Sequence, residues 1–167
     1  FALTGTTIEY ASGTWTAGGA ISPSLVCMGS IGTQTAGMAI SGYNGPNENT
    51  SRVTTVSDYN GTAWTTNPAS VSNARNGMGS VGTQALALVY GGRFNSPPNP
   101  SVINGFTESW DGSAWSTTGE LNIPRDYPGR AGTTNTSALS WGGNPGPLTT
   151  TTETFSMAAG AQTITTS

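Results

Sequence analysis

The sequence predicts an all-β protein made of antiparallel, four-stranded sheets that recur about every fifty residues. Three observations lead to this prediction. Aromatic residues, glycine-threonine steps and apolar runs ending in glycine return in the same order along the chain. Asn-Gly and Asp-Gly dipeptides, which favour tight hairpin turns, separate short runs of β-forming residues. The spacing of apolar residues that marks an amphipathic helix is absent from the 167 residues.

The repeat is defined by three features. The first is an aromatic residue followed five positions later by tryptophan: Tyr10 and Trp15, Tyr59 and Trp64, and Trp110 and Trp115. The second is a Gly-Thr step beginning at residues 32, 82 and 132. The third is an apolar run that closes on glycine, at Gly42, Gly92 and Gly143. Three features in one order, three times over, indicate a true internal repeat.

Each unit divides into four short strands. Residues 84–90 form a nearly continuous apolar run, which is typical of a strand buried on both faces, so we expect an inner strand there. Residues 55–59 and 63–66 flank Asn60-Gly61, and Asp111-Gly112 lies in the same way between Trp110 and Trp115. These segments should form hairpins with the two aromatic side chains close together.

The segments 89–92 and 140–143, with Trp64 and Trp115 downstream, resemble the kelch repeat of β-propellers. Over residues 6–155 the pattern is closest to kelch-like repeats in tail-fibre and structural proteins of tailed bacteriophages and in bacterial surface proteins. The resemblance implies propeller blades around an axis, with Trp15, Trp64 and Trp115 as equivalent packing anchors. The first unit departs from the pattern, because Ser41 replaces the first glycine of the Gly-Gly step and Leu25 stands where later units have arginine.

We place one repeat domain at residues 1–167, with units at about 6–53, 54–105 and 106–150 and a partial unit at 151–167. This gives about three and a half blades, whereas propellers have typically four to eight. We therefore expect the ring to be completed by further blades of a longer chain or by other copies. An open end would leave an exposed strand edge.

Composition excludes several classes of protein. Only 8% of residues are charged, and the chain has no Lys, no His and one Cys, with a net charge of -3. Nucleic-acid binding through phosphate neutralisation needs clustered basic residues, so no nucleic-acid partner is expected. No apolar run is long enough for a membrane span. Zinc fingers, His-ligated metals and Ser-His-Asp triads are excluded, and we predict no cofactor and no metal.

Two arginines occupy equivalent positions, Arg75 and Arg125, each seven residues before the glycine of a Gly-Thr step. The resemblance implies that this position begins an inner strand near the channel mouth, where kelch domains often bind ligands. Arginine could bind carboxylates or stack on sugars there. The alternative, which we favour, is a structural arginine that bonds carbonyl groups or an acid.

The loops after the glycine steps differ most between units, at residues 43–49, 93–100 and 144–147. Variable loops on a repeated scaffold commonly carry a binding surface, so we name Tyr43, Arg93, Phe94 and Asn95 as ligand contacts. The alternative is that Pro and Asn simply form rigid turns.

Other groups fit structural roles better than catalysis. Glu9, Asp58 and Glu108 each precede a repeat aromatic by one or two residues, which favours bonding to loop backbone. Cys27 lies in an apolar stretch and is expected in the core. Galactose oxidase is a kelch-type enzyme, but its copper site needs His ligands, and this chain has no His.

The sequence therefore favours a non-enzymatic virion or extracellular module, such as a phage tail fibre or adhesin, that contacts a cell-surface glycan or a protein in host attachment. The second hypothesis is a purely structural decoration or filament subunit that binds virion or surface proteins. A galactose-oxidase-like or glycan-active enzyme fragment comes third.

Overall fold

The computed structural model describes residues 3–147, 150–158 and 161–167 of the chain. Residues 1–2, 148–149 and 159–160, which fall in the predicted domain and its partial last unit, lie outside the described part. All regular structure in the described residues is β, which confirms the prediction of an all-β protein. None of the described sheets closes on itself into a barrel.

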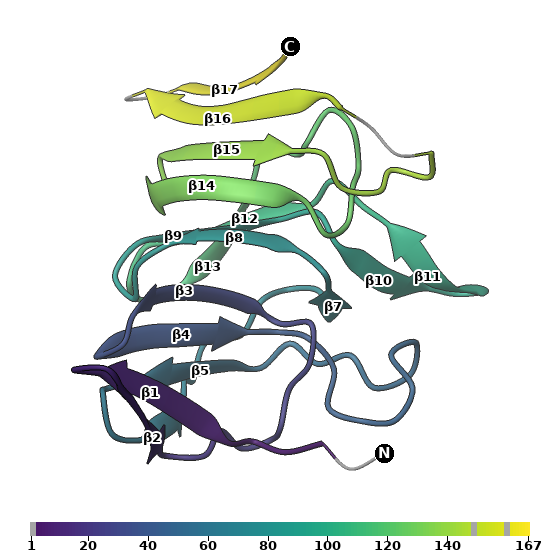
Figure 1. Ribbon diagram of the computed structural model, residues 1–167. Coiled ribbons are helices and arrows are strands. Elements are labelled where there is room, and N and C mark those ends of the chain that lie inside the picture. The colour runs from purple at the N-terminus through teal and green to yellow at the C-terminus, as the bar shows by residue number, and fades with distance from the viewer. Residues whose placement is uncertain (1–2, 148–149, 159–160) are drawn as a thin grey trace.

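The chain begins with a two-stranded hairpin of β1 (Thr7–Ala11) and β2 (Thr14–Gly18). Three four-stranded antiparallel sheets follow (Figure 1). We call them the first, second and third sheets. The first contains β3 (Gly29–Thr33), β4 (Ala36–Ile40), β5 (Val56–Tyr59) and β6 (Trp64–Thr66). The second contains β8 (Gly79–Gly82), β9 (Ala87–Tyr90), β12 (Thr107–Trp110) and β13 (Trp115–Thr118). The third contains β14 (Gly129–Thr134), β15 (Ser137–Trp141), β16 (Thr152–Ala158) and β17 (Ala161–Thr166).

Each four-stranded sheet follows chain order from one edge to the other, and the sheets begin at residues 29, 79 and 129. The sheet therefore recurs every fifty residues, as the repeat predicts. The strand edges β3, β8 and β14 pack side by side, and the three sheets lie one above another in Figure 1.

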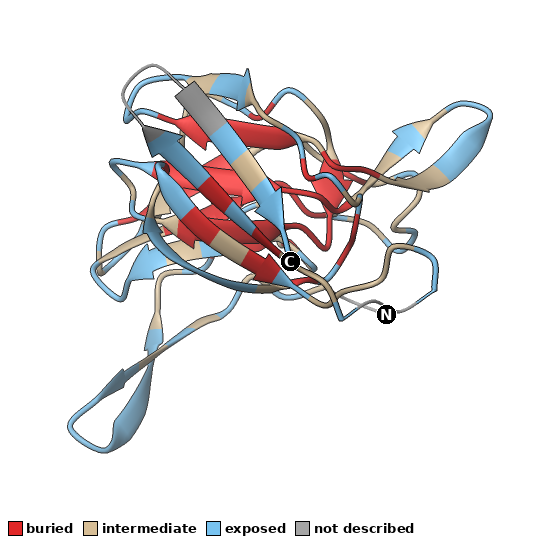
Figure 2. Cartoon of the chain, turned by 90° about the horizontal axis from the view of Figure 1, so that it is seen from above, coloured by how far each residue is buried: buried red, intermediate tan, exposed pale blue. Residues whose placement is uncertain are grey.

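A further three-stranded sheet was not predicted. It joins β7 (Arg75–Asn76), β10 (Arg93–Ser96) and β11 (Asn99–Ile103) in the order β11-β10-β7. The segment 93–100, predicted as a loop, is therefore the first strand, the turn and the start of the second strand of a hairpin that projects from the body of the molecule (Figures 1 and 2). Its proline and asparagine residues masked the strand signal in the sequence.

The aromatic pairs meet across their hairpins as predicted. Tyr59 pairs with Trp64 and their ring centroids lie 4.9 Å apart; the Trp110–Trp115 and Tyr10–Trp15 distances are 5.4 and 5.1 Å. Trp64 and Trp115 pack against buried clusters, but Trp15 is 67% exposed. Its prediction as a packing anchor is wrong for the described chain, because β1 and β2 form only half of a sheet and bury little against it.

Two apolar clusters lie between the sheets. Met38, Ile40 and Val56 of the first sheet pack on Ala87, Val89 and Trp110 of the second. Leu88 and Tyr90 point from the other face of the second sheet toward Ala138 and Phe155 of the third. Because alternate residues of β9 face opposite neighbours, this strand is buried on both sides. Figure 2 shows the buried residues gathered in these central strands, with the projecting hairpins exposed.

The repeated glycines allow close backbone approach. Gly42 and Gly92 have φ angles of +95° and +93°. A Cβ on either would lie 2.7 Å from the carbonyl oxygen of Val26 or Asn76, respectively. Gly143, at φ +82°, has the same relation to Asp126. Glycine is thus required just after the second strand of each sheet, where the backbone passes close to the segment that leads into the first strand.

Candidate functional site

Arg75 and Arg125 are fully buried. Arg75 Nη2 lies 2.8 Å from Glu108 Oε1, and its Nη1 donates to the carbonyl oxygen of Phe106 at 2.8 Å. Arg125 makes the equivalent ion pair with Glu153 at 2.7 Å. Burial lowers the pKa of Arg75, an effect that the neighbouring carboxylate opposes. Neither guanidinium can reach a surface ligand, so their prediction as ligand contacts is wrong and the structural alternative holds.

The two carboxylates are held on both sides. Besides its arginine, Glu108 accepts a hydrogen bond from the backbone N–H of Ser72 at 2.8 Å, and Glu153 accepts one from that of Asn122 at 2.7 Å. Each ion pair therefore joins the segment that enters a sheet, which carries the arginine, to the third strand of that sheet, which carries the glutamate. The backbone N–H adds the loop that precedes the arginine. Buried charges are tolerated when they are paired and hydrogen-bonded in this way.

The first sheet replaces both partners of this ion pair. Leu25 stands at the arginine position and Ser57 at the glutamate position, and both are buried. Leu25 packs with Ile21 and Ala39 in an apolar cluster. The departure noted in the sequence is thus half of a joint change from two charged residues to two uncharged ones.

Two of the predicted variable loops meet the turn at 126–128 on one face, which we call the loop face: residues 43–53, 93–101 and 126–128. Arg52 is its centre and is 8% exposed. Its guanidinium donates to Asn76 Oδ1 at 2.5 Å, to Asn95 Oδ1, and to the carbonyl oxygen of Pro100 at 2.8 Å. It also reaches Asn49 and Ser101, each at 3.3 Å. Arg52 thereby ties the loop after β4 to the β10–β11 hairpin.

Arg93 forms a second link across the loop face. Its Nε donates to the carboxylate of buried Asp126. Asp126 in turn pairs through its backbone with Asn144, at the start of the third variable loop. The three loops predicted to share a face are therefore connected through Arg52, Arg93 and Asp126. Phe94, by contrast, packs its ring on Phe106 at 5.1 Å and is half-buried.

A row of three turns crosses the loop face at equivalent positions. Cys27, Gly77 and Tyr127 all have left-handed φ angles, at +50°, +64° and +48°. The N–H of Tyr127 donates to the carbonyl of Gly77 at 2.7 Å, and the N–H of Gly77 donates to that of Cys27 at 3.0 Å. The row joins the three sheets through their backbones.

This row explains a second correction. Cys27 is exposed, because the left-handed turn carries its side chain to the surface. The apolar residues around Cys27 in the sequence gave no sign of this turn. The prediction of a core cysteine is therefore wrong.

Tyr43 and Tyr127 lie close to the Cys27 thiol. Burial raises the pKa of Tyr127, and a hydrogen bond to Cys27 and the charges of Glu48 and Asp126 add to the effect. The pKa of Tyr43 is raised by burial first, and then by Cys27 and Glu48. Both phenols are thus neutral hydrogen-bonding groups at physiological pH. Tyr127 is 54% exposed and Asn95 is also exposed, so both are available to a ligand.

The charges on the loop face balance. Arg52 and Arg93 are matched by Glu48 and Asp126, and both arginines are bonded to neighbouring side chains. Among the described residues, no three His, Cys, Asp or Glu side chains are grouped to hold a metal, and no helix there could span a membrane. The loop face can therefore offer aromatic surface, amides and hydroxyls rather than free charge.

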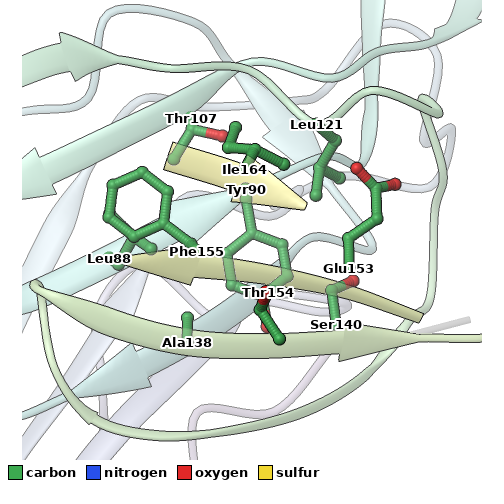
Figure 3. A pocket seen from close by; sticks show the side chains of 10 residues that line it. All are labelled: Leu88, Tyr90, Thr107, Leu121, Ala138, Ser140, Glu153, Thr154, Phe155 and Ile164. Atoms are coloured by element: carbon green, nitrogen blue, oxygen red, sulfur yellow. The ribbon is translucent and has the colours of Figure 1, made fainter. Parts of the chain in front are cut away.

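A small cavity lies between the second and third sheets (Figure 3). The space open to the centre of a water molecule is about 10 Å³, which is near the minimum for one water. Its mostly apolar walls come from Leu88, Tyr90, Ala138 and Phe155, with Ser140 beside them. It is a packing defect rather than a ligand site.

Sequence reasoning missed Arg52, Asn76, Asp126 and Tyr127. Arg52 occurs in one unit, so the repeat gave it no weight. The signal for Tyr127 was its place in a fifty-residue series with Gly77 and Cys27, which the three different residue types concealed.

No family model matches the sequence, and no curated protein matches it. The fold is similar to that of solved structures. One of them, described as "Structure of YjhT", aligns with a TM-score of 0.75 at 16% sequence identity. The alignment covers 96% of this chain and 52% of that one, so the chain spans about half the length of the structure it matches. At this identity the likeness concerns the fold alone.

Proposed function

We propose that this chain is a non-enzymatic structural and binding module of a virion or cell surface, such as part of a phage tail fibre or adhesin. In this proposal the sheets are kelch-like β-propeller blades, and the loop face contacts a neutral glycan or a surface protein. The observation that carries the binding role is the joining of three variable loops into one surface through Arg52, Arg93 and Asp126.

The propeller arrangement is supported by the repetition of the sheets. Three sheets of the same strand order pack in series, and their first strands adjoin one another. A solved chain of similar fold matches over about half of its length. The full length of that chain therefore corresponds to about six units of this repeat. A ring of that size falls within the common range for propellers.

A neutral ligand is supported by the chemistry of the loop face. Arg93 pairs with Asp126, and Arg52 bonds neutral groups of the loops, which leaves Tyr127 and Asn95 as exposed contacts. An aromatic ring suits the apolar face of a sugar, and an amide suits its hydroxyl groups. Single-site affinity should be weak, because few contacts offset the cost of association, and attachment would depend on many copies.

The non-enzymatic part of the proposal is supported by the state of the buried acids. Glu108 and Glu153 are each engaged by an arginine and by backbone N–H groups. Both carboxylates are buried and both of their oxygens already accept hydrogen bonds, so neither is placed to contact a substrate. The second candidate function, a purely structural subunit, is favoured by the exposed aromatic residues of β1 and β2, which suit a protein contact.

A glycan array with the intact chain, displayed in many copies, tests the proposal. Tyr127→Ala and Asn95→Ala should each reduce binding, whereas Trp15→Ala, an exposed aromatic on the β1–β2 hairpin, should leave it unchanged. Binding should vary little with salt. Equal binding by all three variants would remove the loop face as the site, and a collapse of binding in high salt would exclude a neutral ligand. No binding to any glycan would favour the structural subunit.

A further inference from the structure

The β1–β2 hairpin corresponds to the second half of a four-stranded sheet. Tyr10 of β1 pairs with Trp15 of β2 in the same register as Tyr59 with Trp64 and Trp110 with Trp115. On their other edges, β5 pairs with β4, and β12 pairs with β9. Within the described residues, β1 has no strand on that edge.

The exposure of the side chains marks the same gap. Tyr10 is 52% exposed, whereas the equivalent Tyr59 and Trp110 are both 3% exposed. Ile8 is 59% exposed, and the equivalent Ser57 and Glu108 are buried. The hairpin thus carries apolar residues at positions that are covered in the complete sheets.

The half sheet is nevertheless held in place. Trp64 Nε1 donates to Thr7 Oγ1 at 2.8 Å, and Tyr59 donates its hydroxyl hydrogen bond to Glu9. The N–H of Gly19 donates to the carbonyl of Thr62 at 3.1 Å. The free edge of β1 is therefore fixed at a definite position beside the first sheet.

A groove of about 260 Å³ separates this edge from the first sheet. Thr7, Ile8 and Glu9 form one wall of the groove, and β3 and β4 contribute much of the other, including Ile31, Gly37 and Ala39. Between the second and third sheets the equivalent space is filled by two large side chains of β9, Leu88 and Tyr90. The groove is thus open where two alternate side chains of an inner strand would lie.

We propose that β1 and this groove bind a β-hairpin of the same repeat type, supplied by a further segment of the same polypeptide. One strand of the hairpin pairs antiparallel with Thr7–Ala11, and two of its large apolar side chains, two residues apart, enter the groove. The three four-stranded sheets of the described residues show this pairing and side-chain placement. A solved chain of similar fold is about twice as long, which leaves room for a further hairpin in a chain of this fold. The inference concerns a face other than the loop face and requires no ligand.

The chain supplies a hairpin for the test. Gly105, which precedes β12, accepts a hydrogen bond from Leu121 N–H at 2.9 Å, and Gly5, which precedes β1, accepts one from Ile21 N–H at 2.8 Å. A second copy of residues 70–104 that carries Arg75→Leu, fused directly before Gly5, therefore places an inner hairpin at the correct distance from β1; the leucine matches Ile8, which stands where Glu108 pairs with Arg75. In this fusion, amide hydrogen exchange over Thr7–Ala11 should slow by at least about tenfold, because these groups gain strand partners.

The matched control is the same fusion with Leu88→Asp in the added copy alone, which places a charge in the groove and should abolish the slowing. Equal exchange over Thr7–Ala11 in the 167-residue chain and the fusion would overturn the proposal. Dimerisation of the 167-residue chain with slow exchange at Thr7–Ala11 would instead identify a second copy as the occupant and would also overturn it. These readouts do not involve glycan binding, so failure here is distinct from failure of the proposed function.

Discussion

Arg75 and Glu108 form a fully buried ion pair at 2.8 Å, and the same pair recurs fifty residues later for the arginine and forty-five residues later for the glutamate, as Arg125 with Glu153. The first sheet places Leu25 and Ser57 at the two positions instead. The chain thus contains a charged and an uncharged combination at equivalent positions, and the uncharged one provides a natural control for the ion pair.

Replacing one member of the pair should be costly. Arg75→Leu leaves the carboxylate of Glu108 buried without its cation, and the free energy of unfolding should fall by about 3–5 kcal/mol. The double variant Arg75→Leu with Glu108→Ser copies the first sheet and should recover a large part of this loss. Urea denaturation of the three proteins measures both values. A double variant less stable than the single one would show that the pair is not the source of the cost.

Arg52→Ala should loosen the β10–β11 hairpin without unfolding the sheets. The side chain of Arg52 bonds Asn95, the carbonyl of Pro100 and Ser101, so its removal frees the hairpin from the loop after β4. Limited proteolysis should then cut within residues 95–100 faster than in the original chain. Arg130→Ala, an exposed arginine outside these contacts, is the control and should not change the cleavage rate.

Ser140→Val should stabilise the protein. Ser140 borders the cavity of Figure 3, and its buried hydroxyl has no hydrogen-bond partner among the described residues. Val89 holds the equivalent place in the second sheet. Filling the space and removing the unpaired hydroxyl should raise the free energy of unfolding by about 1 kcal/mol.

The control for this substitution is Ser137→Val, on the same strand at an exposed position. Thermal unfolding of the two variants separates cavity filling from β propensity. A similar increase in Tm for both variants would assign the effect to propensity.

The turn between β12 and β13 should weaken in acid. Hydrogen bonds from Ala114 and Ser113 to the carboxylate lower the pKa of Asp111. A carboxylate whose pKa is lower in the folded chain stabilises it above the unfolded pKa of about 3.9, and this contribution is lost as the pH falls through the folded value. Amide exchange at residues 113 and 114 should therefore accelerate below about pH 4.

Asp111→Asn is the matched variant, because Asn60 already holds the equivalent turn with bonds to Thr62 and Ala63 at 3.0 and 2.9 Å. The variant should keep the turn and lose the acid dependence. Identical pH profiles for the two proteins would show that Asp111 does not control the turn.

The repeat made the regular part of the fold predictable. Asn60-Gly61 and Asp111-Gly112 gave the hairpins, and the spacing of Tyr59 and Trp64 gave the ring contacts, because both depend on residues a few positions apart. The face shared by the variable loops was also predictable, since equivalent loops of equivalent sheets emerge together.

What the sequence could not supply depends on contacts between distant residues. Nothing near Arg75 identifies Glu108, although the joint change to Leu25 and Ser57 is a signal that a comparison of the units could have used. The turn that exposes Cys27 is shared with Gly77 and Tyr127 through backbone geometry, so residue type conceals it. Arg52 bonds residues forty or more positions away and has no counterpart in the other units.

The glycine steps connect each sheet to the next one. Gly42 N–H donates to the carbonyl of Arg75 at 2.8 Å, and Gly92 N–H donates to that of Arg125 at 2.8 Å. The second unit therefore carries both kinds of group: the carbonyl of Arg75 accepts from the glycine of the unit before, and the N–H of Gly92 donates to the unit after. A gene segment encoding one unit would bring both groups when duplicated, so proteins of this kind could lengthen by whole units during evolution without inventing a new interface.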